Sequence, residues 1–316
     1  MSRSSEPSAS APLPSAPHVV GSDTPFKLTM FIIASTYVIM LAGMLIADVA
    51  YLATSDGADT APVPASLWMH RPLLQEYGLE WAQPAIRPFL TILAALSTEE
   101  IQYSVKLTLL SCFFTAILSL LVAVPIGYLL SRTDFRSKGL IDAILDIPIV
   151  LPPLIVGLSL LILFKFLPFS LARGVVVYKI PAVVLAQFMV SAAFAIRVMR
   201  ATFDQINPRV EQVALTLGCT QSQAFGMVVL PQAGAGMLTA GTLAWARAMG
   251  EFGPLLIFAG ATRMKTEVLS TTVFLEISIG NLEAAVAVSL IMIFAAVMVM
   301  VVLRLWGAKK LFVSAH

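Results

Sequence analysis

Charged side chains are scarce in this chain, and that scarcity excludes most soluble proteins. Of its 316 residues, 58% are hydrophobic and only 12% are charged, whereas ordinary soluble domains carry about 25% charged residues. So few charges cannot cover the surface of a soluble domain. The formal net charge is +2, so the chain also lacks the strongly basic surface of nucleic-acid-binding proteins, and we expect no nucleic acid among its partners.

Several residue patterns that carry chemistry are also missing. Two cysteines, Cys112 and Cys219, are too few for a disulfide framework, and no cysteine or histidine spacing matches a zinc site. The sequence contains no Gly-Lys dipeptide, which the phosphate-binding loop of an ATPase requires. We therefore expect no catalytic residue, no metal and no cofactor bound by this chain.

Long apolar runs dominate what is present. A helix that crosses ~30 Å of hydrocarbon needs about 20 mostly apolar residues. Six segments meet or approach this length: Leu28–Ala47, Leu107–Leu130, Ile147–Phe164, Ile180–Ile196, Met237–Gly260 and Leu282–Leu303. The third and fourth are the shortest, and the fifth contains two charged residues. The sequence therefore predicts an all-α polytopic protein of the lipid bilayer with six transmembrane helices.

These runs divide the chain into five parts. Residues 1–25 are rich in serine, proline and alanine and bury too little apolar surface to offset the entropy of ordering, so we expect disorder. The first apolar run is longer than that of a signal peptide and lacks a clear cleavage site, which favours a retained helix at 26–48. An extracytoplasmic segment follows at 49–103, then a core with five spans at 104–304 and a tail at 305–316.

Lysine and arginine are enriched in loops on the cytoplasmic side of membranes, so their distribution predicts orientation. With the N-terminus inside, the inside segments hold 11 of these residues and the outside segments hold 8; Arg247, within a span, completes the total of 20. The outside set includes Lys165, Arg173 and Lys179, which count against this orientation. The balance predicts a multi-pass protein of the cell membrane with both termini in the cytoplasm.

The connection between the fourth and fifth spans, 207–231, is too short and too polar to cross a membrane. Asn207 is a favourable N-cap, and Pro208 fits the first helical position, where its missing N–H costs nothing. Gly218 then ends this helix, because glycine accepts the left-handed backbone that follows many helices. A first short helix is therefore predicted from Pro208 to Leu217.

A second helix is predicted immediately after this turn. Thr220 and Gln223 make the T-x-x-Q of a capping box, and Pro231 is expected to stop the helix. Both helices have an apolar face, so the spacing predicts a helix–turn–helix hairpin on the membrane surface. The spacing alone leaves open whether this hairpin binds a partner or only rests on the bilayer.

The hairpin resembles the EAA loop of ABC-transporter permeases of the type I importer class. That motif combines an acidic residue, small residues, a glycine and an Ile/Val-x-Leu-Pro run at fixed spacing. The matching residues here are Glu211, Ala214, Gly218, Val228, Leu230 and Pro231. Gln212 and Val213 depart from the usual glutamate and alanine. The resemblance implies that the matching residues couple the chain to a groove of a cytoplasmic ATPase subunit.

Two further stretches, Leu145–Phe164 and Ala246–Gly260, are similar to the molybdate/sulfate (oxyanion) subgroup of these permeases. The resemblance implies a transport subunit, not an enzyme, that forms the pathway for an oxyanion: molybdate first, then tungstate or sulfate. Ferric iron and polyamines are the alternative substrates within the same class. The implied partners are a dimer of ATPase subunits that binds ATP and Mg, an extracytoplasmic substrate-binding protein and a second copy of the chain.

Candidate residues for the translocation pathway or its gate lie in the same two stretches: Pro152, Pro153, Gly157, Arg247, Glu251 and Gly253. The prolines remove backbone donors, so they predict either a broken helix beside a pathway or a plain helix start. Arg247 and Glu251 are four residues apart and would share a helix face, where each is costly in lipid unless paired. A structural ion pair and a site on the anion pathway both fit this spacing.

Two other function classes are alternatives. An intramembrane enzyme needs a nucleophile with a histidine, paired aspartates or a metal cluster at membrane depth, and no predicted span contains a histidine. A secondary transporter usually has inverted repeats, and we find none across the six predicted spans. The resemblance of the hairpin to the EAA loop therefore favours an importer subunit over an intramembrane enzyme or a secondary transporter.

Overall fold

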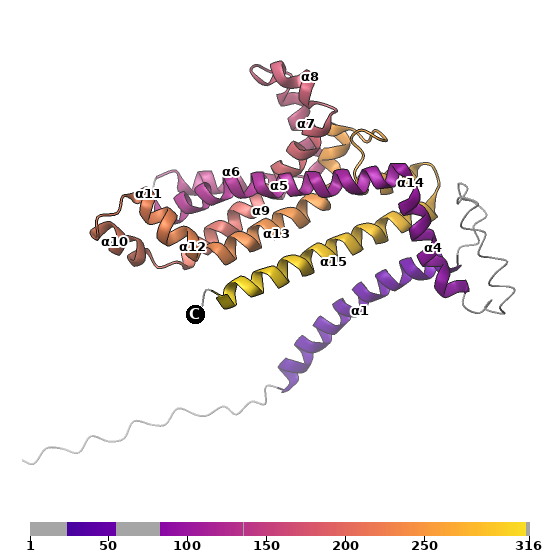
Figure 1. The fold of residues 1–316 in the computed structure, drawn as a ribbon, viewed down its shortest axis with the longest axis horizontal. Helices are drawn as coiled ribbons and strands as arrows, with labels where there is room; N and C mark the ends of the chain where they lie inside the picture. The colour runs from indigo at the N-terminus through magenta and orange to yellow at the C-terminus, as the bar shows by residue number, and fades with distance from the viewer. Residues whose placement is uncertain (1–23, 55–82, 135, 314–316) are drawn as a thin grey trace, which may run out of the picture. The chain divides into compact units, whose positions relative to one another are not determined.

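The computed structural model describes residues 24–54, 83–134 and 136–313, and in these ranges the chain is helical, with no strand (Figure 1). Four helices there are long and apolar enough to cross a membrane: α1 (Thr24–Thr54), α5 (Glu99–Arg132), α9 (Ile180–Gln205) and α15 (Leu282–Val313). Two bent helix pairs raise the number to six when each pair is taken as one span. The predicted all-α polytopic fold is confirmed.

The third predicted span is not one straight helix. α6 (Lys138–Val150) and α7 (Pro153–Leu163) meet at an angle of 110°. The bend falls at Leu151 and Pro152, whose ψ values of 139° and 131° are extended. Each of these residues precedes a proline, which pushes it out of the helical region. The helix therefore breaks at Pro152, and a new helix starts at Pro153.

The fifth predicted span, Met237–Gly260, ends early, and its bounds were wrong. α13 (Gly234–Met249) stops at Gly250, and after Pro254 the chain forms a π-helical turn, η4 (Leu255–Ala259). Glycine weakens a helix, and proline restricts the residue before it to extended conformations. A hydropathy window counts this stretch as apolar but does not detect that the helix ends within it.

Helices also extend into segments that were predicted to lie between or beyond the spans. α1 continues to Thr54, α4 occupies Gln83–Ser97 and α5 begins at Glu99, so both ends of the predicted segment 49–103 are helical. α15 continues to Val313, through most of the predicted tail. The predicted disorder of residues 1–25 falls almost wholly outside the described residues. Short helices occupy other connections: η2 (Phe169–Ala172), α8 (Arg173–Val176) and α14 (Leu269–Ser278).

The chain divides after Ala47 into two compact units. In the second unit, polar side chains are buried and large apolar side chains are exposed, the reverse of the distribution in a soluble protein. α5, α9 and α13 lie side by side in it (Figure 1). The inward face of α5 carries small polar residues, all at most 2% exposed: Ser104, Thr108, Ser111, Thr115 and Ser119. Its exposed residues include Phe113, Phe114, Ile117 and Leu121. Small residues permit close helix contact while large apolar ones suit lipid, so this pattern is typical of a membrane bundle.

α13 packs through its smallest residues. Ala240, Ala244 and Ala248 are fully buried. A Cβ atom at Gly236 would lie only 2.2 Å from the Thr202 hydroxyl of α9, so the two helices approach this closely because a glycine stands at that position. Close packing of small residues therefore holds the centre of the bundle together.

Candidate functional site

The connection between α9 and α13 folds as the predicted helix–turn–helix hairpin. α10 (Pro208–Thr216) begins after Asn207, whose side chain accepts a hydrogen bond from the Arg209 amide at 3.0 Å. The capping box of Thr220 and Gln223 is present with both of its hydrogen bonds, at 2.9 and 3.3 Å. Local caps therefore define the starts of both hairpin helices.

Gly218 forms the turn of the hairpin. Its φ is 92°, a conformation that side-chain-bearing L-residues rarely adopt. A Cβ atom built at this position would meet nothing within 4 Å. The turn therefore needs glycine for its backbone conformation and not for space.

The second hairpin helix ends at Gln232, one residue after Pro231, so the predicted stop is met to within one residue. α11 (Gln221–Ala224) leads into a π-helical turn, η3 (Phe225–Val229), and then into α12 (Leu230–Gln232). In an α-helix a proline ring clashes with the carbonyl four residues earlier. The wider π turn just before Pro231 relieves this clash. The chain then bends by 71° into α13.

Glu211 attaches the hairpin to the end of α5. Its carboxylate is largely buried, accepts a hydrogen bond from the Tyr128 hydroxyl and lies 3.4 Å from Nε of Arg132. Arg132 also donates from Nη2 to the Ile206 carbonyl, at 2.8 Å, just before the hairpin begins. The Tyr128 ring packs against Phe225, with 4.6 Å between the ring centroids. Glu211 thus fixes the first hairpin helix to α5, and the ring contact of Tyr128 with Phe225 attaches the second.

The other motif residues divide between a buried and an exposed side of the hairpin. Ala214 is buried, Val228 and Leu230 are half-buried, and Pro231 is exposed. Three large apolar side chains project into the open: Val213 is 57% exposed, Leu217 80% and Met227 72%. We call these three residues the hairpin tip. An apolar tip on an anchored hairpin is a surface that gains free energy when a partner covers it.

The two helix breaks contact each other. A Cβ atom at Gly157 of α7 would lie 2.7 Å from Cα of Pro254, and one at Gly253 would lie 3.0 Å from Cβ of Pro153. These distances are shorter than ordinary Cβ contacts, so the backbones approach this closely because both positions are glycine. The structure thus brings Pro153, Gly157 and Gly253 together, beside the bend at Pro152.

Arg247 and Glu251 form an ion pair, although not on one helix. α13 ends before Glu251, and the turn at Gly250 places Oε1 of Glu251 2.5 Å from Nη1 of Arg247. The Glu251 side chain is 1% exposed, and the guanidinium lies 5.5 Å from the centroid of the Phe194 ring. Removing one partner would leave a buried charge without its counter-ion. The spacing predicted this contact but not the backbone that makes it.

Comparison with known proteins agrees with this arrangement. Residues 123–309 match the family of the binding-protein-dependent transport system inner membrane component. The chain belongs to this family. The matched range contains the hairpin, both helix breaks and the ion pair of Arg247 with Glu251.

Similar members of this permease family transport oxyanions. The chain is 39% identical over 152 residues to the molybdate/tungstate transport system permease protein WtpB of Pyrococcus abyssi, which covers 48% of this chain and 58% of that protein. It is 30% identical over 210 residues to the sulfate transport system permease protein CysT of Escherichia coli, covering 65% and 76%. It is 33% identical over 177 residues to the molybdenum transport system permease protein ModB of Azotobacter vinelandii, covering 54% and 78%.

Solved ABC transporters share the fold of this permease. A bacterial ABC transporter involved in the import of the acidic polysaccharide alginate has a TM-score of 0.57 at 16% identity, over 78% of this chain and 93% of that chain. The alginate transporter in complex with a pentasaccharide-bound periplasmic protein has a TM-score of 0.55 at 14% identity, over 77% and 92%. The likeness concerns the fold. With the family and the apolar helices, it identifies a multi-pass inner-membrane permease.

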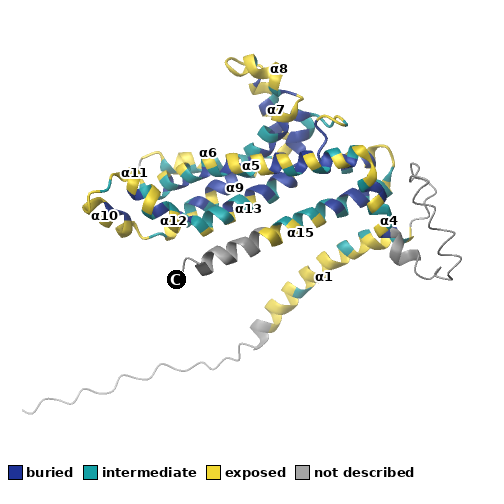
Figure 2. Ribbon diagram, in the orientation of Figure 1, coloured by how far each residue is buried: buried dark blue, intermediate teal, exposed yellow. Residues whose placement is uncertain are grey.

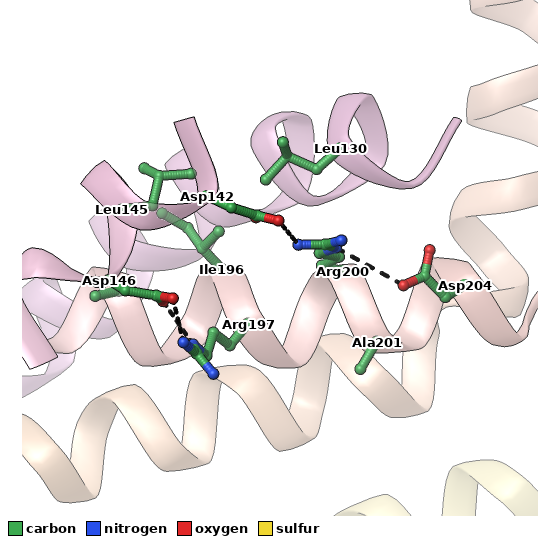
Figure 3. A pocket seen from close by; sticks show the side chains of 10 residues that line it. Leu130, Asp142, Leu145, Asp146, Ile196, Arg197, Arg200, Ala201 and Asp204 are labelled. Carbon is green, nitrogen blue, oxygen red and sulfur yellow. Dashed lines mark hydrogen bonds and ion pairs between the residues drawn. The ribbon is translucent and has the colours of Figure 1, made fainter. Parts of the chain in front are cut away.

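Sequence reasoning missed a charged contact between α6 and α9 of the permease. Arg197 donates two hydrogen bonds to Asp146, and Arg200 donates to Asp142 (Figure 3). A cavity of about 370 Å³ lies beside these pairs. The sequence did contain an indication of this contact. The two aspartates are four residues apart and the two arginines are three residues apart, so each pair lies on one face of its helix. Tyr128 was missed as well, since no sequence spacing connects it with Glu211.

A further charged cluster lies beyond the second helix break. Arg263 pairs with Glu100 of α5 and, at 2.7 Å, with Glu276 of α14. Glu267 is fully buried, and neither of its carboxylate oxygens has a hydrogen-bond partner among the described residues. Burial raises the pKa of Glu267 more than the nearby Thr272 and Arg263 lower it. Within the residues that the structure describes, no group of three or more histidine, cysteine or acidic residues could hold a metal ion.

Proposed function

We propose that this permease forms the translocation pathway of an ABC importer for an oxyanion and is driven by a separate ATPase. The observation that carries the proposal is the hairpin, which Glu211 fixes to α5 and which presents an apolar tip. The relatives belong to molybdate, tungstate and sulfate transport systems, which supports an oxyanion as substrate. Molybdate is the first candidate, followed by tungstate and sulfate.

The hairpin tip docks in a groove of the ATPase subunit. Burial of a large apolar side chain contributes about 1.5–3 kcal/mol, so the three tip residues supply a useful part of the docking free energy. Movement of the hairpin then passes to α5 through Glu211 and to α9 through the short link at Asn207. ATP and Mg bind to a dimer of ATPase subunits, because this sequence contains no phosphate-binding loop.

We place the gate of the pathway where the two helix breaks meet. The backbone there comes from Pro152, Pro153, Gly157 and Gly253. The ion pair of Arg247 with Glu251 spans the end of α13. Non-helical backbone at membrane depth is tolerated where it is buried in protein or lines a water-filled pathway. The guanidinium of Arg247, 30% exposed, has five N–H donors that suit an oxyanion, and Glu251 orients it.

The importer contains two copies of this chain and an extracytoplasmic substrate-binding protein, with both chain termini in the cytoplasm. A structural neighbour of the same fold is in complex with a periplasmic protein, which supports the binding-protein partner. The excess of lysine and arginine in the inside segments supports the orientation.

Reconstitution in proteoliposomes tests this function. The chain is combined with the ATPase subunit and the substrate-binding protein of the same organism, and uptake of labelled molybdate, tungstate and sulfate is measured. We expect ATP-dependent uptake that disappears when any component is omitted, and no ATP hydrolysis by the chain alone. ATP hydrolysis by the isolated chain, or uptake driven by an ion gradient without the ATPase, would contradict the proposal. Uptake of ferric iron or a polyamine but of no oxyanion would contradict the substrate class.

A further inference from the structure

Helix α6 is attached to the bundle by charge more than by packing. None of its residues is buried (Figure 2). Its apolar side chains include Leu140, 64% exposed, and Val150, 79% exposed. Its main neighbour is α9. A helix with no fully buried side chain gains less from the hydrophobic effect, so other interactions contribute to keeping α6 in place.

Two ion pairs connect α6 to α9. Nε of Arg197 donates to Oδ1 of Asp146 at 2.6 Å, and its Nη2 donates to the other carboxylate oxygen. Nη1 of Arg200 donates to Asp142, and its Nε lies 3.8 Å from Oδ2 of Asp204 (Figure 3). We call the two Asp–Arg pairs between the helices the α6–α9 ladder. Three carboxylates surround two guanidinium groups, so the cluster is net negative and does not suit an oxyanion.

The ladder borders an open space instead of a packed core. The cavity of about 370 Å³ is lined by the ladder and by apolar side chains of α5, α6 and α9 (Figure 3). All four ladder side chains are at least 31% exposed. Ion pairs with this exposure are weak, because water competes for both charges. Leu145 packs partly buried on the apolar core at the cavity wall, so when α6 leaves α9 this contact is lost, but no fully buried side chain of α6 is exposed.

Helix α6 joins two parts that the proposed function requires to move. α9 leads directly into the hairpin at Asn207, whereas α6 leads through the 110° bend into α7, whose Gly157 contacts Pro254. From this placement, and resting on the proposed coupling, we propose that the α6–α9 ladder is a latch. It holds α6 on α9 in one state and releases it when the hairpin moves. Its four residues are positioning residues that link hairpin motion to the contact between the helix breaks.

Charge reversal tests whether the ladder acts through its pairs. Asp146→Arg and Arg197→Asp each oppose like charges, and the double variant restores opposite charges. We expect each single variant to lower ATP-dependent molybdate uptake about fivefold or more, the lower end of typical coupling effects, and the double variant to return within about twofold of wild type. Single reversals with normal uptake, or a double variant no better than the singles, would overturn the latch.

The chain offers a matched control for charge reversal. Asp134→Arg reverses the charge of a residue whose only ion pair among the described residues is with Lys138, four residues later, and that pair does not connect α6 to α9. The Asp134 side chain is fully exposed, so the substitution changes one surface charge close to the ladder without touching it. We expect normal uptake from this variant. Loss of uptake equal to that of the ladder variants would show that any charge change near α6 is harmful, and would overturn the specific role of the ladder.

A reversible cross-link tests whether the ladder has to open. Leu145→Cys and Ile196→Cys place thiols on α6 and α9 at the wall of the cavity and leave the ladder intact. Cys112→Ala and Cys219→Ser remove the native thiols, and a short cross-linker with a reducible bond joins the helices in the full complex. We expect uptake to fall in proportion to cross-linking and to recover on reduction, which also shows that the protein is folded. Full uptake with α6 fixed to α9 would overturn the latch.

The ATPase activity of the full complex separates failure of the latch from failure of the proposed substrate. It is measured with the same cross-linked sample and needs no knowledge of the transported solute. If wild-type complex hydrolyses ATP but takes up no molybdate, the proposed substrate is wrong. In that case, loss of ATP hydrolysis on cross-linking and recovery on reduction still support the latch, whereas unchanged hydrolysis overturns it.

Discussion

Substitutions at Gly218 change backbone strain in the hairpin and little else. Its φ is 92°, and no atom lies within 4 Å of the place where a side chain would begin. The left-handed region costs most L-residues about 1–2 kcal/mol and β-branched residues more, whereas asparagine visits it more readily. Transport should therefore fall in the order glycine, asparagine, alanine, valine, which is not the order of side-chain size.

The strain sets the size of the effect. A cost of about 1–2 kcal/mol lowers the fraction of hairpins in the docking conformation roughly 5- to 30-fold, because about 1.4 kcal/mol corresponds to a factor of ten. We expect Gly218→Ala to reduce uptake in this range, Gly218→Asn by less than about threefold and Gly218→Val by more than about 30-fold. Gly226 is the matched control. It also faces open space but has no positive φ, so Gly226→Ala should be neutral.

The assay is ATP-dependent oxyanion uptake in proteoliposomes, with co-purification of the ATPase subunit as a second readout. Membrane levels of all variants should equal that of the wild type, because insertion depends on the apolar helices and not on the hairpin. Normal uptake by the alanine variant would show that the conformation of the turn does not matter for coupling. A larger loss for asparagine than for alanine would show that side-chain size governs the position, and either result would refute the reasoning.

Three further changes test the anchor, the helix breaks and the orientation. Glu211→Gln removes the charge that pairs with α5. Uptake and ATPase co-purification should fall about tenfold, as expected for the loss of hydrogen bonds to a charged group. Unchanged values would show that the anchor is dispensable. Gly157→Ala places a Cβ atom 2.7 Å from Cα of Pro254 and should lower the melting temperature of the protein in detergent. The control Gly174→Ala faces open space and should leave the melting temperature unchanged. Equal melting temperatures for the two variants would contradict the close contact. Reporter fusions after Leu140 and His316 should both give a cytoplasmic signal, and a periplasmic signal at either would overturn the orientation.

Features that depend on nearby residues could be predicted from the sequence. The caps at Asn207 and Thr220 and the turn at Gly218 involve groups within four positions of one another, and all three occur as expected. The apolar runs predicted α1, α5, α9 and α15, because a helix that meets lipid must be apolar over its whole length. The contact between Arg247 and Glu251 was found for the same reason, although its backbone is not helical.

Errors arose where distant segments decide the local backbone. The second hairpin helix contains a π turn at Phe225–Val229, and no residue spacing indicates that turn. α13 ends at Met249, eleven residues before the end of its predicted run at Gly260, and Gly253 then packs against α7. The partner of Glu211 is Tyr128, 83 positions earlier, which only the packing of α5 against the hairpin can bring near. The spacing of residues along one helix does not predict contacts between segments that are distant in the sequence.

Small residues and charged pairs hold different parts of this permease together. α5, α9 and α13 meet through buried serine, threonine, alanine and glycine, whose close contacts do not allow the helices to slide without loss of packing. Ion pairs occur instead at the connections: Glu211 with Arg132 at the hairpin, the α6–α9 ladder, and Arg263 with its two glutamates at the other end of α5. The side chains of the α6–α9 ladder are at least 31% exposed, so its pairs exchange with water at little cost and can break and form again. A rigid centre with charged connections at both ends is the arrangement expected of a protein that passes hairpin movement to its helix breaks while its transmembrane packing stays intact.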